Sequence, residues 1–297
     1  MTEPVPSTHI SLNGRLLRRD EAHISVFNQA LFNSFGVYES IEVDAGVAFH
    51  LDDHLERLFH SARLIELPMP YDGATIRRWI ETLLAADDIT ESLLRILVFG
   101  PNDNDETLVY VLPGLLPQYP STFYTQGAAA ITYQGCRALP QAKTLNTLVN
   151  YLALRRARRM GVHEAFLVNG EGCLTEGSRS NLFVIAGGQL ITPPATEVLS
   201  GITRDLVWKL AASRGIAASE APVALARLAS LDEMFVTSTS MHIIPIVRVD
   251  DQPINGGRIG PITRALMNDF ESYYAHIMGR ELLASPSAND QAGEIRT

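Results

Sequence analysis

The chain has 297 residues, 46% of them hydrophobic, with a formal net charge of -9 and a pI near 5.4. This acidic balance argues against a nucleic-acid partner, whose phosphates would be repelled, and the short, interrupted apolar runs argue against a membrane span. The two cysteines, Cys136 and Cys173, are too few for a disulfide framework, and the first residues lack a signal-peptide pattern, so we expect a cytoplasmic protein.

The first 116 residues are predicted to form a small α/β domain, of the α+β type, around one antiparallel sheet. Asn13-Gly14 is a strong turn signal within a hairpin over residues 9–19, and residues 37–43 alternate as a strand before a short strand at 47–49. Helices are expected at 52–66 and 74–86, and strands at 92–99 and 107–112.

Residues 117–135 are predicted to contain an interdomain connector and the first strand of a larger domain, because prolines and glycines precede an apolar run at 128–133. Residues 136–280 are expected to form this strand-rich domain. Its predicted helices cover 144–160, 201–213 and 261–276, and its strands cover 165–168, 173–176, 181–185, 189–191 and 234–237. The polar residues 281–297 are expected to be a disordered tail.

The helix predicted over 144–160 places one lysine at a special position. Leu145, Leu148, Val149 and Leu152 recur at helical spacing, so this helix is expected to bury one stripe, with Lys143 at its N-terminal edge. The arginines at 155, 156, 158 and 159 precede a glycine and indicate a solvated helix end rather than a nucleic-acid site.

An acid follows this lysine at the end of the predicted strand 173–176. A lysine at a helix start and an acid at a strand end are what a protein needs to hold pyridoxal phosphate, with the lysine as Schiff base and the acid against the ring nitrogen. Because most lysines are solvated surface charges, the hypothesis depends on this pairing of Lys143 with Glu176.

Two further segments indicate anion sites, although each has a commoner explanation. The helix that starts after Gly201 offers free backbone amides, but most helix starts bind only water. The hydroxyl run Ser238-Thr239-Ser240 follows a buried strand, but such hydroxyls more often cap a turn.

Four motifs, in this order, resemble those of the class IV, or fold-type IV, pyridoxal-phosphate aminotransferases. They are Lys143-Thr144-Leu145-Asn146, Thr175-Glu176-Gly177-Ser178-x-x-Asn181-Leu182-Phe183, Gly201-Ile202-Thr203-Arg204-Asp205 and Val236-Thr237-Ser238-Thr239. The resemblance spans residues 9–276. It implies a small N-terminal α/β domain, a larger strand-rich C-terminal pseudo-barrel domain, and a homodimer with the active site between the domains.

The resemblance also implies residue roles. Lys143 would be the catalytic, Schiff-base lysine that moves a proton between the substrate carbon and pyridoxal 5'-phosphate, and Glu176 would contact the pyridine nitrogen. The phosphate group is assigned to Arg57, Ile202, Thr203 and Thr239, and Ser238 is assigned to the cofactor. Tyr38 and Arg95 match substrate-pocket positions of family members. Apart from the resemblance, Arg179 is assigned to the substrate because it lies three residues beyond Glu176, in a loop that must pass beside the cofactor; Ser240 is assigned to the substrate as well, and no metal is expected.

The three arginines also have structural interpretations. Arg57 could instead form a surface ion pair with Asp53 or Glu56. Arg95 could pair with an acid in the core or across a dimer interface, and Arg179 could simply line its loop, because ion-pair networks resemble functional sites.

Subfamily features are mixed. Leu145-Asn146 resembles the D-amino-acid and lyase groups, whereas typical branched-chain enzymes have Gly-Gly-Asn-Tyr after the lysine. The run from Glu176 to Asn181 also differs from their Glu-Gly-Ser-Gly-Glu-Asn. We therefore expect amino transfer between a D-amino acid and a 2-oxo acid such as 2-oxoglutarate or pyruvate. The match of Arg95 to a branched-chain Tyr-x-Arg position, and the absence of an Arg-x-His clamp in residues 100–106, keep branched-chain L-amino acids and (R)-amines as alternatives.

Two other classes of function are less well supported. An aminodeoxychorismate lyase shares the Lys-x-Leu-Asn sequence, but Glu176-Gly177-Ser178 and Ile202-Thr203 replace the Glu-Cys-Cys and Ile-Met of that group. A binding protein that has lost its chemistry would not be expected to keep both Lys143 and Glu176.

Overall fold

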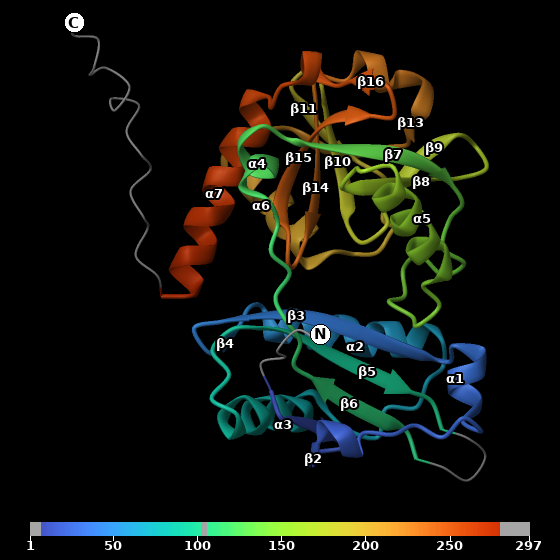
Figure 1. Ribbon diagram of the computed structural model, residues 1–297. Coiled ribbons are helices and arrows are strands. Elements are labelled where there is room, and N and C mark those ends of the chain that lie inside the picture. Colours follow the sequence, from blue (N-terminus) through green and yellow to red (C-terminus); the bar gives the residue numbers. More distant parts are fainter. Residues whose placement is uncertain (1–6, 102–105, 280–297) are drawn as a thin grey trace, which may run out of the picture.

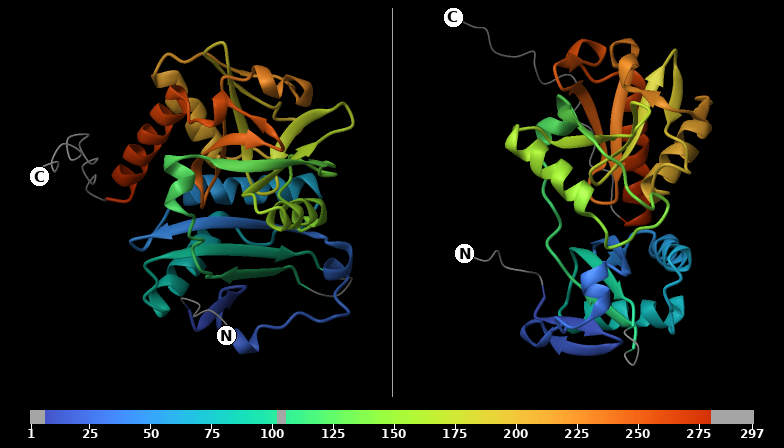
Figure 2. Two further views of the ribbon diagram at one scale, coloured as in Figure 1. Left: turned by 45° about the horizontal axis from the view of Figure 1, so that its top comes forward. Right: turned by 90° about the vertical axis from the view of Figure 1, so that its right-hand side faces the viewer.

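The computed structural model describes residues 7–101 and 106–279, so the predicted tail at 281–297 lies outside the described residues. Two sheets stack one above the other, and a connector runs between them (Figures 1 and 2). This mixed α/β architecture, with a curled C-terminal sheet, confirms the predicted fold class.

The N-terminal sheet has six strands in the order β2-β1-β6-β5-β3-β4, and every pair is antiparallel. The predicted Asn-Gly hairpin is present, with positive φ angles at Asn13 and Gly14. The strands are β1 (His9–Leu12), β2 (Arg15–Arg18), β3 (Gly36–Asp44), β4 (Val47–Ala48), β5 (Ser92–Phe99) and β6 (Leu108–Leu112).

Helices α2 (Leu51–Leu64) and α3 (Gly73–Ala86) cover one face of this sheet, and the short α1 (Gln29–Asn33) precedes β3. Alternate residues of a strand point to opposite faces. Val37, Ile41, Leu94 and Ile96 therefore pack with the helices in a buried core, which leaves the residues between them for the other face.

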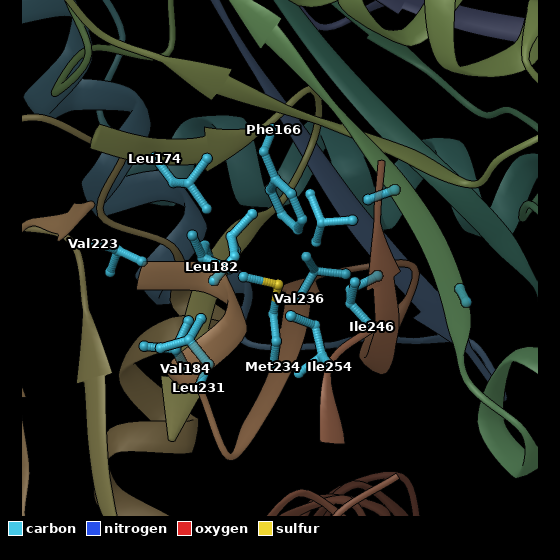
Figure 3. Close-up of a cluster of buried hydrophobic side chains, with 14 of the residues drawn as sticks. Phe166, Leu174, Leu182, Val184, Val223, Leu231, Met234, Val236, Ile246 and Ile254 are labelled. Atoms are coloured by element: carbon cyan, nitrogen blue, oxygen red, sulfur yellow. The ribbon is translucent and has the colours of Figure 1, made fainter. Parts of the chain in front are cut away.

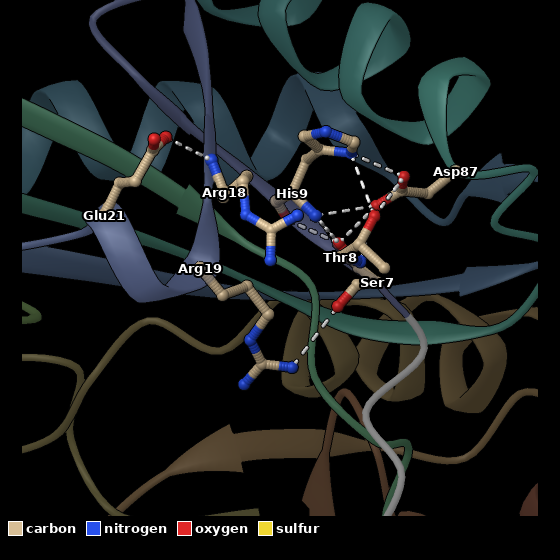
Figure 4. Close-up of polar contacts among 7 residues, drawn as sticks. All are labelled: Ser7, Thr8, His9, Arg18, Arg19, Glu21 and Asp87. Atoms are coloured by element: carbon tan, nitrogen blue, oxygen red, sulfur yellow. Dashed lines mark hydrogen bonds and ion pairs between the residues drawn. The ribbon is translucent and has the colours of Figure 1, made fainter.

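The first described residues are tied to the end of α3 by one carboxylate, as Figure 4 shows. Asp87 accepts hydrogen bonds from the backbone amides of Thr8 and His9, at 2.8 and 2.9 Å, and from the Ser7 hydroxyl at 2.7 Å. Its other oxygen lies 2.7 Å from His9 Nδ1. Burial opposes ionisation, but these donors outweigh it and hold the pKa of Asp87 below its usual range.

The connector contains a short helix, α4 (Ser121–Thr125), and leads into a ten-stranded sheet. This sheet has the order β12-β11-β10-β14-β15-β7-β8-β9-β13, with β16 beside β15, and the β11–β12, β15–β7 and β7–β8 pairs are parallel. Its strands are β7 (Ala128–Gln134), β8 (Glu164–Val168), β9 (Cys173–Gly177), β10 (Asn181–Ala186), β11 (Gln189–Thr192), β12 (Ala218–Glu220), β13 (Val223–Ala224), β14 (Glu233–Ser238), β15 (His242–Val249) and β16 (Gln252–Pro253).

The curl of this sheet encloses an apolar core, part of which is drawn in Figure 3. Helices α5 (Leu148–Arg159), α6 (Ile202–Ser213) and α7 (Pro261–Ile277) pack outside it. Phe49, in the turn between β4 and α2, enters the core formed by α6, α7 and the sheet, so the two parts of the molecule share apolar packing there. Among the described residues, none of the helices has the length and apolarity that a membrane crossing requires.

Two predictions about elements are wrong. No strand is expected between 241 and 260, yet β15 lies inside the sheet between β14 and β7; Pro245 interrupts its apolar pattern, and proline argues against a central strand. The helix predicted from 144 begins at Leu148, and its buried residues are Ala153 and Ala157, while Leu148 is 64% exposed.

Candidate active site

A cavity of about 560 Å³ lies between the two sheets. All eleven site residues expected from the sequence line it, although they come from segments far apart in the chain. They are Tyr38, Arg57, Arg95, Lys143, Glu176, Arg179, Ile202, Thr203, Ser238, Thr239 and Ser240.

The floor of the cavity is the open face of the N-terminal sheet. Tyr38 and Ser40 alternate with the residues of β3 that face α2, and across the ladder they lie opposite Leu97 and Arg95 of β5. Arg95 is exposed toward this cavity and, within the described part of the chain, it has no ion pair. Its alternative, an acid partner in the core, is not found among the described residues.

Lys143 lies in an extended segment rather than at a helix edge. Thr144 forms a β-bridge with Val37, and backbone hydrogen bonds of 2.9 Å run from Tyr38 N to Lys143 O and from Leu145 N to Gly36 O. These bonds hold residues 143–145 along β3, which is why α5 cannot start before Leu148. Lys143 Nζ lies 4.6 Å from the centre of the Tyr38 ring.

Glu176, at the end of β9, is buried against an arginine that sequence reasoning missed. Arg137 Nε lies 2.9 Å from Glu176 Oε1, but the alignment is poor, and neither atom has a hydrogen bond with a described residue. The Leu199 amide donates to Oε2 at 3.2 Å. Burial raises the pKa of Glu176, although Arg137, the Leu199 amide and Lys143 act in the opposite direction.

Arg137 escaped prediction because the residues around it, at 135–142, carry no periodic pattern. Its guanidinium donates to the carbonyl groups of Leu139 and Ala142 at 3.1 and 2.9 Å, and also to that of Pro140. These bonds fold the segment before Lys143 around a single side chain.

The loop after Glu176 is fixed by a buried acid in β8. Glu164 accepts hydrogen bonds from Ser178 N at 3.0 Å and from Ser180 Oγ at 2.9 Å, and also from the Ser178 hydroxyl. A Cβ atom at Gly177 would meet Ser180 Oγ at 2.1 Å, so glycine is required for this close approach. The loop therefore presents Arg179 to the cavity from a fixed backbone.

Arg57 forms an ion pair with a buried acid of β3. Its Nε and Nη2 donate to the two oxygens of Glu39 at 2.8 Å each, and Nη1 donates to Ser200 O at 3.0 Å. The alternative of a surface pair with Asp53 or Glu56 is wrong, because Arg57 turns inward and Glu39 is fully buried.

His54 supports this pair from α2. Its Nδ1 lies 2.9 Å from Glu39 Oε2. Burial disfavours an ionised Glu39, but Arg57 and His54 outweigh it and hold the pKa of Glu39 well below its usual range. Burial lowers the pKa of His54, which stays neutral and donates to the carboxylate. Arg57 is therefore a charged, preorganised group at the cavity wall.

The opposite wall combines a helix start with hydroxyl groups. Gly201 precedes α6, and a Cβ atom there would meet Asn181 Oδ1 at 1.9 Å, so glycine allows the backbone to lie close to Asn181. Thr237 Oγ1 and Ser238 Oγ, from the end of β14, are buried without a hydrogen-bond partner in the described part of the chain. Such groups are costly unless something binds them.

The lining has an excess of positive charge in an acidic protein. Among the described residues that line the cavity, Glu176 is the one acid, beside Lys143 and four arginines. Arg57 and Arg137 are compensated by Glu39 and Glu176, whereas Arg95 and Arg179 have no ion pair with a described residue. The cavity is therefore suited to an anionic ligand.

The profile of a family described as amino-transferase class IV matches residues 36–249. A putative branched-chain-amino-acid aminotransferase of Methanocaldococcus jannaschii is 32% identical over 276 residues, covering 88% of this chain and 95% of the relative. A D-alanine aminotransferase of Listeria innocua is 34% identical over 274 residues, covering 88% and 94%.

Solved structures agree with these relatives. A branched-chain amino acid aminotransferase of T.th., solved with pyridoxamine 5'-phosphate, has a TM-score of 0.85 and 27% identity, covering 94% of this chain and 97% of that one. The branched-chain amino acid aminotransferase from Escherichia coli has a TM-score of 0.82 and 27% identity, with the same coverage.

Proposed function

The chain belongs to the amino-transferase class IV family and is a pyridoxal-phosphate-dependent aminotransferase; from this premise we propose that it transfers the amino group of a D-amino acid to a 2-oxo acid. The observation that carries the proposal is the cavity in which Lys143 and Glu176 lie beside two arginines, Arg95 and Arg179, that have no acid partner among the described residues.

The residues of the cavity fit the phosphorylated cofactor. Glu176 Oε1 is a buried oxygen without a hydrogen bond, suited to a protonated ring nitrogen. The amides at the start of α6, the hydroxyl groups of Thr203, Ser238 and Thr239, and the guanidinium of Arg57 supply donors for a phosphate. We propose that these residues hold pyridoxal 5'-phosphate.

Each side chain then has a defined task. When bound, the cofactor supplies an aldehyde that takes up the amino group and a ring that withdraws electrons from the substrate carbon. Lys143 Nζ would hold the cofactor and would carry the proton to and from the substrate carbon. Glu176 would lie against the ring nitrogen, and a protonated nitrogen there would favour the ionised carboxylate that burial otherwise opposes.

The substrate carboxylate needs a cation, because an unpaired charge in a cavity with little water is costly. Arg179, on the roof, and Arg95, on the floor, are suited to this task, and Tyr38 and Ser240 add hydroxyl donors. The Leu145-Asn146 sequence and the relatives named D-alanine aminotransferase favour D-amino acids.

The test is a panel of amino donors in both enantiomers, with 2-oxoglutarate and with pyruvate as acceptors. We expect D-alanine and other D-amino acids to be preferred over their L-enantiomers and over (R)-amines. Activity confined to L-leucine, L-isoleucine and L-valine would overturn the D-amino-acid assignment.

Branched-chain L-amino acids are the second candidate. Leu93, Leu97, Leu145 and Leu154 give the cavity apolar lining suited to a branched side chain, and the structures reported above are branched-chain enzymes. The same donor panel separates the two candidates, because it scores both chirality and side-chain shape.

The functional unit is proposed to be a cytoplasmic homodimer. Phe27, just before α1, and Phe32, within it, are 85% and 87% exposed, and a second cavity of about 380 Å³ lies between α1 and residues 137–146. Large exposed apolar groups are suited to an interface. Sedimentation equilibrium would measure the assembly. The free thiols Cys136 and Cys173 agree with a reducing compartment.

We also propose domain limits at 1–116, 117–135 and 136–280. Separate buried cores in the N-terminal and C-terminal sheets support this division. The insertion of Phe49 into the C-terminal core indicates that the two domains are firmly docked.

A further inference from the structure

Tyr119 lies in the connector, between β6 and α4, and lines the cavity from outside both sheets. Its half-buried ring packs against the core of the curled sheet, and its hydroxyl lies 3.2 Å from Ser240 Oγ. The guanidinium of Arg179 lies 5.6 Å from the centre of the ring. The connector thus contacts a cation of the cavity wall through one aromatic side chain.

Arg179 itself is held at its backbone and left free at its charged end. Glu164 binds the residues on both sides, Ser178 and Ser180, so the backbone position is fixed. Its guanidinium makes no hydrogen bond or ion pair to any residue of the ranges 7–101 and 106–279. An arginine has several rotatable bonds, so without the ring its charge would sample many positions.

The surroundings of Tyr119 keep its ring in place without adding charge. His163 is buried against it, with ring centres 5.6 Å apart and an interplanar angle of 89°. Burial, with a smaller contribution from Arg179, lowers the pKa of His163 to about 4, so it is neutral at physiological pH. The neutral ring of His163 supports Tyr119 and does not repel the guanidinium strongly.

We propose that Tyr119 is a positioning residue that sets the preference for carboxylate-bearing substrates by holding the guanidinium of Arg179 at the cavity wall. The inference rests on the proposed function, in which Arg179 binds the substrate carboxylate. An aromatic face attracts a guanidinium but does not neutralise it, unlike the carboxylates that pair with Arg57 and Arg137. The charge of Arg179 is oriented and remains available to an anion.

The experiment measures binding to the cofactor-loaded enzyme by calorimetry, with 4-methylpentanoate and its uncharged counterpart 4-methylpentanamide. Tyr119→Leu is expected to weaken carboxylate binding about threefold to tenfold, as loss of one cation–π contact predicts, and to leave amide binding unchanged. Tyr119→Phe keeps the ring and should bind the carboxylate as the wild type does. Tyr119→Met replaces the leucine variant if that variant does not fold.

Two further variants complete the design. In an Arg179→Ala background, Tyr119→Leu should cause no additional loss, because the two residues act through one contact. Tyr124→Leu is the matched control, since Tyr124 belongs to the adjacent α4 and packs on the same core without lining the cavity. It should leave both affinities unchanged.

Equal weakening of carboxylate and amide binding by Tyr119→Leu would show a merely structural ring and overturn the inference. A full effect of Tyr119→Leu in the Arg179→Ala background would do the same. If Arg179→Ala weakens carboxylate binding but Tyr119→Leu does not, the inference alone fails. If Arg179→Ala has no effect, the carboxylate assignment in the proposed function fails as well.

Discussion

His242 joins the two parts of the molecule through a charged hydrogen-bond network, and its replacement should reduce stability in a pH-dependent way. Its Nε2 donates to Glu42 of β3 at 3.0 Å, and its Nδ1 donates to Glu271 of α7 at 3.0 Å. Tyr274 O–H lies 2.9 Å from both Glu42 and Asp44. His242 is thus the cation between carboxylates from both parts of the molecule.

The expected magnitude follows from the pKa of His242. Burial opposes the charge, but the hydrogen bonds to Glu271 and Glu42 outweigh it and raise the pKa from 6.5 to about 9. Since a difference of one in pKa corresponds to about 1.4 kcal/mol, protonated His242 contributes about 3 kcal/mol to the free energy of unfolding. Because the folded pKa is raised, this contribution is complete below about pH 6.5 and is lost as the pH rises to about 9.

The assay is urea unfolding of the wild type and of His242→Asn between pH 6 and pH 9.5. Asparagine is chosen because His242 has a φ of 54°, a conformation that asparagine tolerates better than most residues. The gap in unfolding free energy should be about 3 kcal/mol at pH 6 and well under half of that at pH 9.5. His276→Asn, at an exposed position of α7, is the control.

A difference in unfolding free energy that stays constant across this pH range would contradict the prediction, because the loss of neutral hydrogen bonds or of packing does not depend on pH in this range. Titration of Tyr274 does not contribute to the measured pH dependence. Burial, aided by Glu42, raises the pKa of Tyr274, so its hydroxyl keeps its proton throughout the assay.

The remaining predictions concern the cavity and the N-terminal strand. Lys143→Ala should lose most transamination, and borohydride reduction followed by peptide mapping should place the cofactor on Lys143 in the wild type; its recovery on another lysine would refute the assignment. Arg57→Ala should weaken cofactor retention, measured by cofactor titration. Because it leaves Glu39 buried without its partner, it should also reduce the free energy of unfolding by about 3–5 kcal/mol, measured by chemical unfolding. Adding Glu39→Gln should restore the stability but not the cofactor affinity. Arg179→Ala should raise KM for a D-amino acid more than for an (R)-amine without a carboxylate, and equal effects on both donors would count against its role. Asp87→Asn should destabilise the protein by about 1–3 kcal/mol in thermal unfolding near pH 7, and because the pKa of Asp87 is lowered, the loss should shrink as the pH falls below about 4.

The residues of the candidate site could be predicted from the sequence, because most of them occur in short local motifs. Lys143-Thr144-Leu145-Asn146 and the run from Thr175 to Asn181 can be recognised without knowing what surrounds them. Most strands of the N-terminal sheet, and the two helices that cover it, could also be predicted, because hydrophobic residues recur there with periods of two and 3.6 residues. All eleven predicted site residues consequently line one cavity.

The contacts of these groups could be seen only in the folded structure. Arg57 binds Glu39 rather than its helical neighbours, because β3 turns that acid toward α2. Thr144 pairs with Val37 and delays the start of α5, although the local pattern favours helix from residue 144. Arg137 and Tyr119 lie in segments without periodicity, and their partners are distant in the chain. Such long-range pairings depend on how the two sheets stack, and hydrophobic periodicity carries no information about which charged groups that stacking brings together.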